Sequence, residues 1–291
     1  MDSRTDCNSS REALTGITKE QKIFIPHGSG ANGKSTFIGI VETLLGDYHK
    51  SVASETLMMQ KGRSSSGPNE DIVRLKGARL ASTSETEEGQ ILAEALVKRM
   101  TGEDTMVGRG VFAKESLEYK PQFKVWLYAN HKPIIRGDDY AIWRRICLIP
   151  FEQTFEGKTD DKDLKDKLRA ELPGILNWAI EGCLVWQKEG LNPPPKVLAA
   201  TQEYREEMDL LAEWMEVFCV ISPERQATTG ELYLCYSMWC DKNRVFPMNR
   251  KVFGRKIKSR GFTPDKINGQ RGYRGIGVKR EYDYFKEGGV A

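Results

Sequence analysis

A glycine-rich segment near the start of the chain carries the residue types that hold a nucleoside triphosphate. The segment from Gly28 to Ser35 reads GSGANGKS and matches the pattern G-x-x-x-x-G-K-[ST]. Glycines let backbone N–H groups approach a phosphate, the lysine contacts the β- and γ-phosphates, and the hydroxyl binds Mg²⁺. We therefore predict that phosphate is bound by Gly28, Gly30, Asn32, Gly33, Lys34, Ser35 and Thr36.

Other polar residues follow apolar runs at places where they could complete a catalytic site. Hydrolysis needs a carboxylate that orients Mg²⁺ and activates water, and Glu85 after ARLASTS is the candidate, with Glu87 in reserve. Asn130 ends FKVWLYAN, where it could contact the γ-phosphate or cap a strand end. Arg144 and Arg145 precede ICLIPF and could supply an arginine finger to a neighbouring subunit's nucleotide, or form a surface ion pair.

Strands and helices are predicted to alternate around these residues. Short apolar runs predict strands over 22–26, 78–85, 123–130 and 145–151. Apolar residues at helical spacing predict helices over 34–46 and 89–102. This alternation indicates a parallel α/β sheet. Residues 160–189 are expected to be helical, and after NPPP another helix is expected to run to about Val220.

The C-terminal part of the chain is strongly basic. The 291 residues have a formal net charge of +3, but residues 242–280 contain thirteen Lys and Arg and one acid, Asp265. A basic block on an otherwise acidic chain is typical of a protein that binds a polyanion, most often nucleic acid. A solvated basic face is the alternative, although interleaved aromatic residues favour a small folded module.

Composition and hydropathy exclude several classes of protein. A chain with 39% hydrophobic and 29% charged residues has the composition of a folded protein. No apolar run has the length of a membrane span, and the polar start MDSRTDCNSSRE is unlike a secretory signal, so we expect a cytoplasmic protein without a membrane partner. The six cysteines form no C-x-x-C pair, which favours buried thiols over a zinc site.

The motifs together resemble those of superfamily 3 helicases, most closely the phage, plasmid and poxvirus primase-helicase group. The resemblance covers about residues 14–155 and rests on GSGANGKST, LASTSETEEG, LVKRMTGEDTMVGRG, FKVWLYANHKP and YAIWRRICLIPF, in this order. Residues 232–280 resemble the winged-helix domain that commonly ends these proteins. The implied fold is an AAA+-like P-loop NTPase core with a parallel sheet over 1–155, a helical connector over 156–227 and a winged helix over 228–291.

The resemblance implies an ATP-dependent replicative DNA helicase of a phage, plasmid or mobile element in a bacterial cell. Such proteins form hexameric rings, hydrolyse ATP with Mg²⁺ between subunits, translocate on single-stranded DNA and open forked duplex. Ser35 and Glu85 would hold the Mg²⁺. Many members carry a primase or polymerase domain before the ATPase, whereas fewer than thirty residues precede the loop here. We therefore expect a fragment or a helicase without those parts, which would work with a separate primase or polymerase.

The family also implies two DNA-binding regions. A β-hairpin that grips DNA in the ring channel would span about residues 106–121, with Arg109, Lys114 and Lys120 as candidate contacts. In the winged helix, residues 249–261 would form the recognition helix and residues 268–275 the wing. The candidate contacts in that domain are Arg250, Lys251, Arg255, Arg271 and Arg274, together with Tyr273.

Three other functions share some of these features. A small-molecule P-loop kinase would have the same loop but no need for a basic C-terminal module. A DNA-binding AAA+-type ATPase that remodels nucleoprotein would have both parts without unwinding duplex. A structural DNA-binding protein would not hydrolyse ATP.

Overall fold

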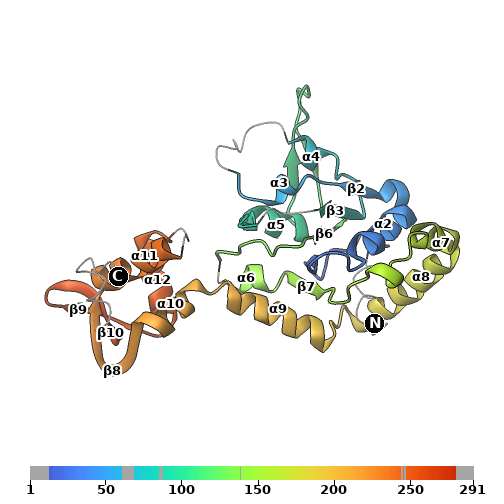
Figure 1. The fold of residues 1–291 in the computed structure, drawn as a ribbon. Coiled ribbons are helices and arrows are strands. Elements are labelled where there is room, and N and C mark those ends of the chain that lie inside the picture. The colour runs from blue at the N-terminus through green and yellow to red at the C-terminus, as the bar shows by residue number, and fades with distance from the viewer. Residues whose placement is uncertain are drawn as a thin grey trace. The chain divides into compact units, whose positions relative to one another are not determined.

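The computed structural model describes residues 13–60, 69–84, 88–137, 139–243, 245 and 247–279. The chain forms two compact units, which divide between Met208 and Asp209 (Figure 1). The sequence predicts boundaries after residues 155 and 227 instead. The difference arises because residues 156–208 are part of the N-terminal unit, and because Leu211, Trp214 and Cys219 belong to the core of the C-terminal unit.

A five-stranded parallel sheet forms the centre of the N-terminal unit, in the order β2-β3-β6-β1-β7. The strands are β1 (Ile23–His27), β2 (His49–Ser51), β3 (Leu80–Ser84), β6 (Lys124–Tyr128) and β7 (Ile146–Pro150). The predicted parallel α/β sheet is thereby confirmed. The sequence did not indicate β2, because its three residues HKS lack an apolar pattern.

Helices pack around this sheet. They are α2 (Lys34–Leu45), α3 (Ser54–Leu57), α4 (Glu70–Val73), α5 (Glu94–Thr101), α6 (Tyr140–Trp143), α7 (Leu164–Ala170), α8 (Leu172–Glu189) and α9 (Pro195–Glu207), with single 3₁₀ turns η1 (Gly46–Tyr48) and η2 (Gly157–Thr159). Helix α5 begins later than predicted because Ile91 and Leu92 instead make β-bridges to Ile134 and Met58. In the described ranges, no helix combines the length and the apolar character needed to cross a membrane.

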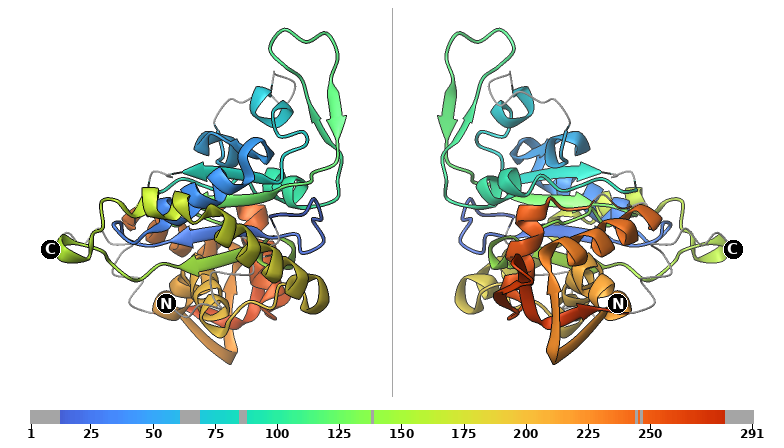
Figure 2. Two further views of the ribbon diagram at one scale, coloured as in Figure 1. Left: turned by 90° about the vertical axis from the view of Figure 1, so that its right-hand side faces the viewer. Right: turned by 90° about the vertical axis from the view of Figure 1, so that its left-hand side faces the viewer.

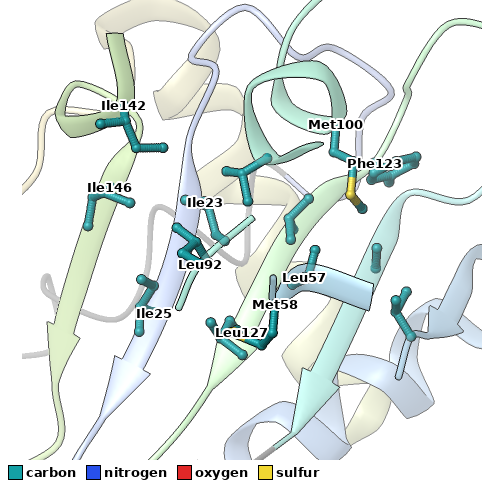
Figure 3. Packing of buried hydrophobic residues seen from close by; sticks show 14 of the residues in the cluster. Ile23, Ile25, Leu57, Met58, Leu92, Met100, Phe123, Leu127, Ile142 and Ile146 are labelled. Carbon is teal, nitrogen blue, oxygen red and sulfur yellow. The ribbon is translucent and has the colours of Figure 1, made fainter. Parts of the chain in front are cut away.

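Each face of the sheet is covered by its own apolar core. Ile23 and Ile25 of β1 point to one face, where they join a buried cluster with Leu57 (Figure 3). The intervening Phe24 points to the other face and contacts Trp126, with ring centroids 5.9 Å apart, in a cluster that includes Ile38 of α2. Burial on both faces explains why these strands read as continuous apolar runs.

Helix α9 protects the edge strand β7. The N–H of Leu148 donates to Thr201 Oγ1 at 3.0 Å, and the buried Tyr204 packs edge-on against Trp143, with ring centroids 5.5 Å apart. Uncovered edge strands tend to pair with other chains, so this helix removes a site of aggregation. The segment predicted as part of a connector therefore completes the sheet domain.

Strands β4 (Met106–Gly108) and β5 (Leu117–Tyr119) form the antiparallel hairpin expected within residues 106–121. The hairpin extends beyond the sheet and helices of its unit (Figures 1 and 2). Its base is anchored, because Met106 is buried and the Tyr119 hydroxyl donates to the Ile72 carbonyl of α4 at 2.5 Å. Burial raises the pKa of Tyr119 to about 12.

The C-terminal unit combines a three-stranded antiparallel sheet, ordered β8-β10-β9, with helices. Its elements are α10 (Leu210–Phe218), β8 (Cys219–Thr228), α11 (Thr229–Lys242), α12 (Arg250–Ser259), β9 (Thr263–Ile267) and β10 (Gln270–Val278). Trp214, Tyr236 and Phe253 form an aromatic core with centroid separations of 5.1 to 5.7 Å. Asn268 and Gly269, both at positive φ, make the turn between β9 and β10.

Candidate nucleotide site

The carboxyl-terminal edge of the parallel sheet brings several predicted site residues together. The glycine-rich loop joins β1 to α2, and Asn130 follows β6, the strand beside β1. A β-bridge between His27 and Ala129 holds the two strand ends next to each other. Open α/β sheets bind ligands at this edge, so the topology places the predicted residues where a ligand is expected.

The backbone of the loop has the form of an anion-binding nest. Gly30, Ala31 and Gly33 have φ angles of 113°, 45° and 79°. A left-handed residue that follows an ordinary one, as Gly33 follows Asn32, turns successive N–H groups toward one side, and α2 starts directly afterwards at Lys34. The partial positive charge at the helix N-terminus adds to the attraction for an anion.

Asn32 fixes the shape of the loop from inside. Its buried side chain donates from Nδ2 to the Phe151 carbonyl at 3.1 Å and accepts at Oδ1 from Lys34 Nζ at 2.8 Å. A Cβ atom on Gly28 would lie 2.0 Å from Asn32 Nδ2 and 2.3 Å from the Phe151 oxygen. Glycine at position 28 is therefore required by this hydrogen bond.

The Lys34 amine lies among oxygen acceptors from both strand ends. It donates to the Gly28 carbonyl at 2.7 Å, to Asn32 Oδ1 at 2.8 Å and to Asn130 Oδ1 at 3.0 Å. Burial lowers the pKa of the amine. All three acceptors are neutral, so a phosphate at this point would supply the negative charge that these partners lack.

His27 and Lys132 belong to the same region and were not singled out from the sequence. Burial lowers the pKa of His27, and the nearby charges of Lys132 and Lys34 lower it further. Lys132 forms an ion pair with Glu207 at 2.7 Å. His27 directly precedes the loop, and Lys132 follows Asn130 by two residues within FKVWLYANHKP, which was the available clue.

Of the remaining residues predicted to bind phosphate or metal, the structure describes Ser35 and Thr36 but not Glu85 and Glu87. Ser35 is exposed and Thr36 is half-buried in the first turn of α2. Strand β3 ends at Ser84, beside the end of β6. Glu85 and Glu87, the candidate carboxylates, lie outside the described residues.

An apolar cavity of about 700 Å³ adjoins the loop. Gly33 and Thr36 belong to its lining, and a ring carbon of Phe155 lies 3.5 Å from the Cβ position of Gly33. The other walls come from α2, α7 and α8 and include Phe37, Leu168, Ile175 and Trp178. A mostly apolar cavity with a polar loop at one side is typical of a small-molecule site.

Arg144 and Arg145 lie at the opposite edge of the sheet from the loop of their own chain. They directly precede β7, which runs parallel to β1 along its whole length. The five residues of β7, at about 3.3 Å each, separate the arginines from the loop edge by roughly 16 Å. Neither side chain can therefore reach a phosphate in its own loop.

The two arginines have different surroundings. Arg145 is buried, and its guanidinium donates to Thr101 Oγ1 at 3.2 Å, to the Ala141 carbonyl at 2.5 Å and to Gln21 Oε1 at 3.2 Å. Burial and the neighbouring Arg144 charge lower the pKa of Arg145. Arg144 is half-buried and donates to Gln21 Oε1. Arg145 therefore holds the fold together at this edge, and Arg144 is the better candidate for a finger.

The predicted DNA contacts fall on separate surfaces of the two units. Arg109, Lys114 and Lys120 are exposed on or next to the hairpin β4–β5. In the C-terminal unit, a groove of about 1010 Å³ lies between α12 and the hairpin β9–β10. Its cationic lining consists of the predicted Arg250, Lys251, Arg255 and Arg271, together with Lys258 and Lys266, and its acidic residue is Asp265.

Two residues expected to reach DNA have other contacts. Tyr273 is buried, and its hydroxyl donates to the Gly254 carbonyl of α12 at 2.8 Å. Arg274 forms an ion pair with Asp265 and is not part of the groove lining. Tyr273 thus supports α12 through this hydrogen bond, and it belongs to the lining of the groove although little of its side chain is exposed.

The different surroundings of the two arginines predict different costs of truncation. Arg145→Ala removes the hydrogen bonds to Thr101 Oγ1 and the Ala141 carbonyl, leaves Gln21 Oε1 with Arg144 alone and opens a gap, so we expect a loss of about 2–4 kcal/mol of unfolding free energy. Arg144→Ala is expected to cost less than about 1 kcal/mol. Urea denaturation of both variants measures the difference. Equal losses would contradict the assignment of Arg145 to the fold.

Comparison with known proteins finds similar proteins in large DNA viruses. No family model matches it. It is 30% identical over 265 residues to "Putative helicase 022R" of Frog virus 3 and 30% identical over 249 residues to "Putative helicase L207/L206" of Acanthamoeba polyphaga mimivirus. These matches cover 84% and 79% of this chain but 27% and 26% of those proteins, so the chain spans about a quarter of their length. It is also 24% identical over 247 residues, or 77% of the chain, to "Putative primase C962R" of African swine fever virus, of which 25% is covered.

Solved structures agree on the fold. The apo C-terminal region of NrS-1 superposes with a TM-score of 0.52 at 13% identity, covering 89% of this chain and 67% of that one. At this identity the likeness concerns the fold alone. Together with the parallel sheet and the loop from Gly28 to Ser35, it means that the N-terminal unit has a P-loop NTPase core. The chain is similar to proteins that carry helicase and primase names in large DNA viruses.

Proposed function

We propose that this chain is the motor of an ATP-dependent replicative DNA helicase of superfamily 3, encoded by a phage, plasmid or other mobile element. The observation that carries the proposal is the Lys34 amine, held at 3.0 Å by Asn130 from the neighbouring strand in a loop shaped to bind an anion. The viral proteins with helicase and primase names support the same function.

ATP would bind with its phosphates in the loop and its base in the adjoining apolar cavity. Lys34 would exchange its neutral oxygen partners for the β- and γ-phosphates, which are better partners for a buried cation. Asn130 would sense the γ-phosphate, because it already contacts the amine that binds there. Ser35 and Glu85, with Glu87 in reserve, would hold Mg²⁺, which supplies charge that offsets the phosphates. Glu85 would also polarise the attacking water.

The site would be completed by a second copy of the chain. Since Arg144 lies about 16 Å from its own loop along the strand direction, it can stabilise transition-state charge only in a neighbour's site. Copies that each give a finger and receive one are arranged head to tail, which closes into a ring when the rotation between neighbours divides a full turn. We propose a ring of six. A primase or polymerase domain or protein would act with this ring.

Two surfaces would bind DNA. The hairpin β4–β5 carries Arg109 and Lys114 on a projecting arm and would grip a single strand in the ring. The C-terminal unit, with α12 followed by the hairpin β9–β10, would be a winged helix whose basic groove contacts forked or duplex DNA.

The proposal predicts ATP turnover that depends on Lys34. Lys34→Ala should abolish hydrolysis, because the site loses the cation that faces the developing charge, a loss of several kcal/mol. We expect wild-type ATPase activity to rise with single-stranded DNA and a tailed duplex to be unwound. ATPase activity retained by a folded Lys34→Ala variant would contradict the nucleotide site. ATP turnover without strand displacement would instead favour an ATPase that remodels nucleoprotein.

If the base of ATP binds in the cavity, a large side chain placed there should weaken binding of the base and leave binding of the phosphates unchanged. A Cβ atom on Gly174 of α8 meets no atom within 4 Å, and Gly174 lines the cavity, so Gly174→Phe should place its ring in the cavity with no clash at the Cβ. We expect ATP affinity to fall roughly tenfold or more. Inorganic tripolyphosphate should bind as before.

The matched control is Gly39→Phe on α2, where a Cβ atom also meets nothing within 4 Å but which does not line the cavity. Calorimetry with both ligands gives the comparison. Equal ATP affinity in Gly174→Phe and the wild type would show that the base binds elsewhere.

The groove of the C-terminal unit predicts a change in salt dependence. Lys258→Ala or Lys266→Ala should lower the log–log slope of duplex affinity against salt by about 0.9 for each phosphate that the variant no longer neutralises. Lys279→Ala is the control, because Lys279 donates to the Glu216 carbonyl at 2.8 Å and lies outside the groove lining. The same slope in all three variants would argue against the groove as the duplex site.

A further inference from the structure

Phe112, at the tip of the hairpin β4–β5, is 98% exposed, more than any other large hydrophobic side chain in the described part of the molecule. Val111 beside it is 58% exposed, and Val107 on β4 is 47% exposed. Large apolar side chains are usually buried, and an exposed apolar tip commonly marks a binding surface. A partner that binds this tip must therefore present an apolar face against which the Phe112 ring can pack.

The tip is an ordered turn on an anchored arm. Directly after β4, the Asn69 N–H donates to the Arg109 carbonyl at 2.9 Å, and at the tip, the Ala113 N–H donates to the Gly110 carbonyl at 3.2 Å. The Val111 N–H contacts Glu70 Oε2 of α4 at 3.3 Å. Little backbone entropy is therefore lost when Phe112 binds a partner, and the remaining cost is that of fixing its side-chain rotamer.

Two cations flank the exposed ring. Arg109 and Lys114 are both exposed and lie on either side of Phe112 in the sequence. The acids near the tip are Glu115 and Glu70 of α4, whose carboxylate already accepts from the Val111 N–H, and Glu118 lies further along on β5. Two cations beside an exposed aromatic ring match a chain that alternates phosphates with flat bases. In duplex DNA the bases are already stacked on one another, so only an unpaired strand offers such a face.

We propose that Phe112 stacks on an unpaired base of single-stranded DNA while Arg109 and Lys114 contact the flanking phosphates. The hairpin thereby distinguishes single strand from duplex without reading sequence, because every base has an aromatic face. This inference rests on the proposed function and assigns the residue that selects the strand type.

The test compares substitutions at one position in the full chain. Fluorescence anisotropy with labelled oligothymidine should show about tenfold weaker binding for Phe112→Ala, the scale of one base stack removed. Phe112→Leu, which keeps an apolar side chain without an aromatic face, should be similarly weak, and Phe112→Trp should bind as tightly as the wild type. Thermal unfolding checks that each variant is folded.

Two further readouts separate stacking from charge. The salt slope of Phe112→Ala should equal that of the wild type, whereas Arg109→Ala should lower the single-strand slope by about 0.7. Affinity for blunt duplex should be the same in Phe112→Ala and the wild type.

The outcomes distinguish this inference from the proposed function. Single-strand affinity retained in Phe112→Ala, or an equal loss for single strand and duplex, would overturn stacking while the wild type still hydrolyses ATP and binds DNA. Tight binding by Phe112→Leu would also overturn it, because an apolar contact would then suffice. A wild type that binds no single strand would count against the proposed function itself.

Discussion

The common direction of the five strands is the constraint on which the rest of the N-terminal unit depends. Because all strands are parallel, every segment that follows a strand emerges at one edge and every segment that precedes one lies at the other. The loop after β1 and Asn130 after β6 therefore meet at one edge, while Arg144 lies at the other. Apolar cores on both faces hold this direction fixed, since reversing a strand would break its pairing with each strand beside it.

Strand β7 links the two edges structurally. It starts directly after the arginines, where Arg145 ties it to Thr101 and Gln21, and leads into Phe151, whose carbonyl holds Asn32 in the loop. Helix α9 covers its outer side. The end of β7 is therefore joined to the glycine-rich loop by a hydrogen bond, and Arg144, the candidate finger, precedes its start. This separation is the one that a site shared between neighbouring copies would need.

The sequence predicts what depends on local spacing. The glycine-rich loop and the helix that follows it are set by short patterns, and the hairpin at 106–121 was expected from the family resemblance. The sequence placed Asn130 at a strand end, and its contact with Lys34 is a finding of the structure. Burial that depends on distant residues was not predictable. Arg145 is buried by Thr101 and Gln21, and Tyr273 by the packing of α12, and no pattern near either residue indicates these partners.

The most direct test of the account is whether two inactive chains restore each other. A Lys34→Ala chain keeps its Arg144 finger, and an Arg144→Ala chain keeps its loop, so a mixed ring contains interfaces where both are intact. The account predicts negligible ATPase activity for each variant alone and recovery on mixing, highest near equal amounts, with size-exclusion chromatography confirming joint assembly. Joint assembly without any recovered activity would contradict a nucleotide site that is shared between copies.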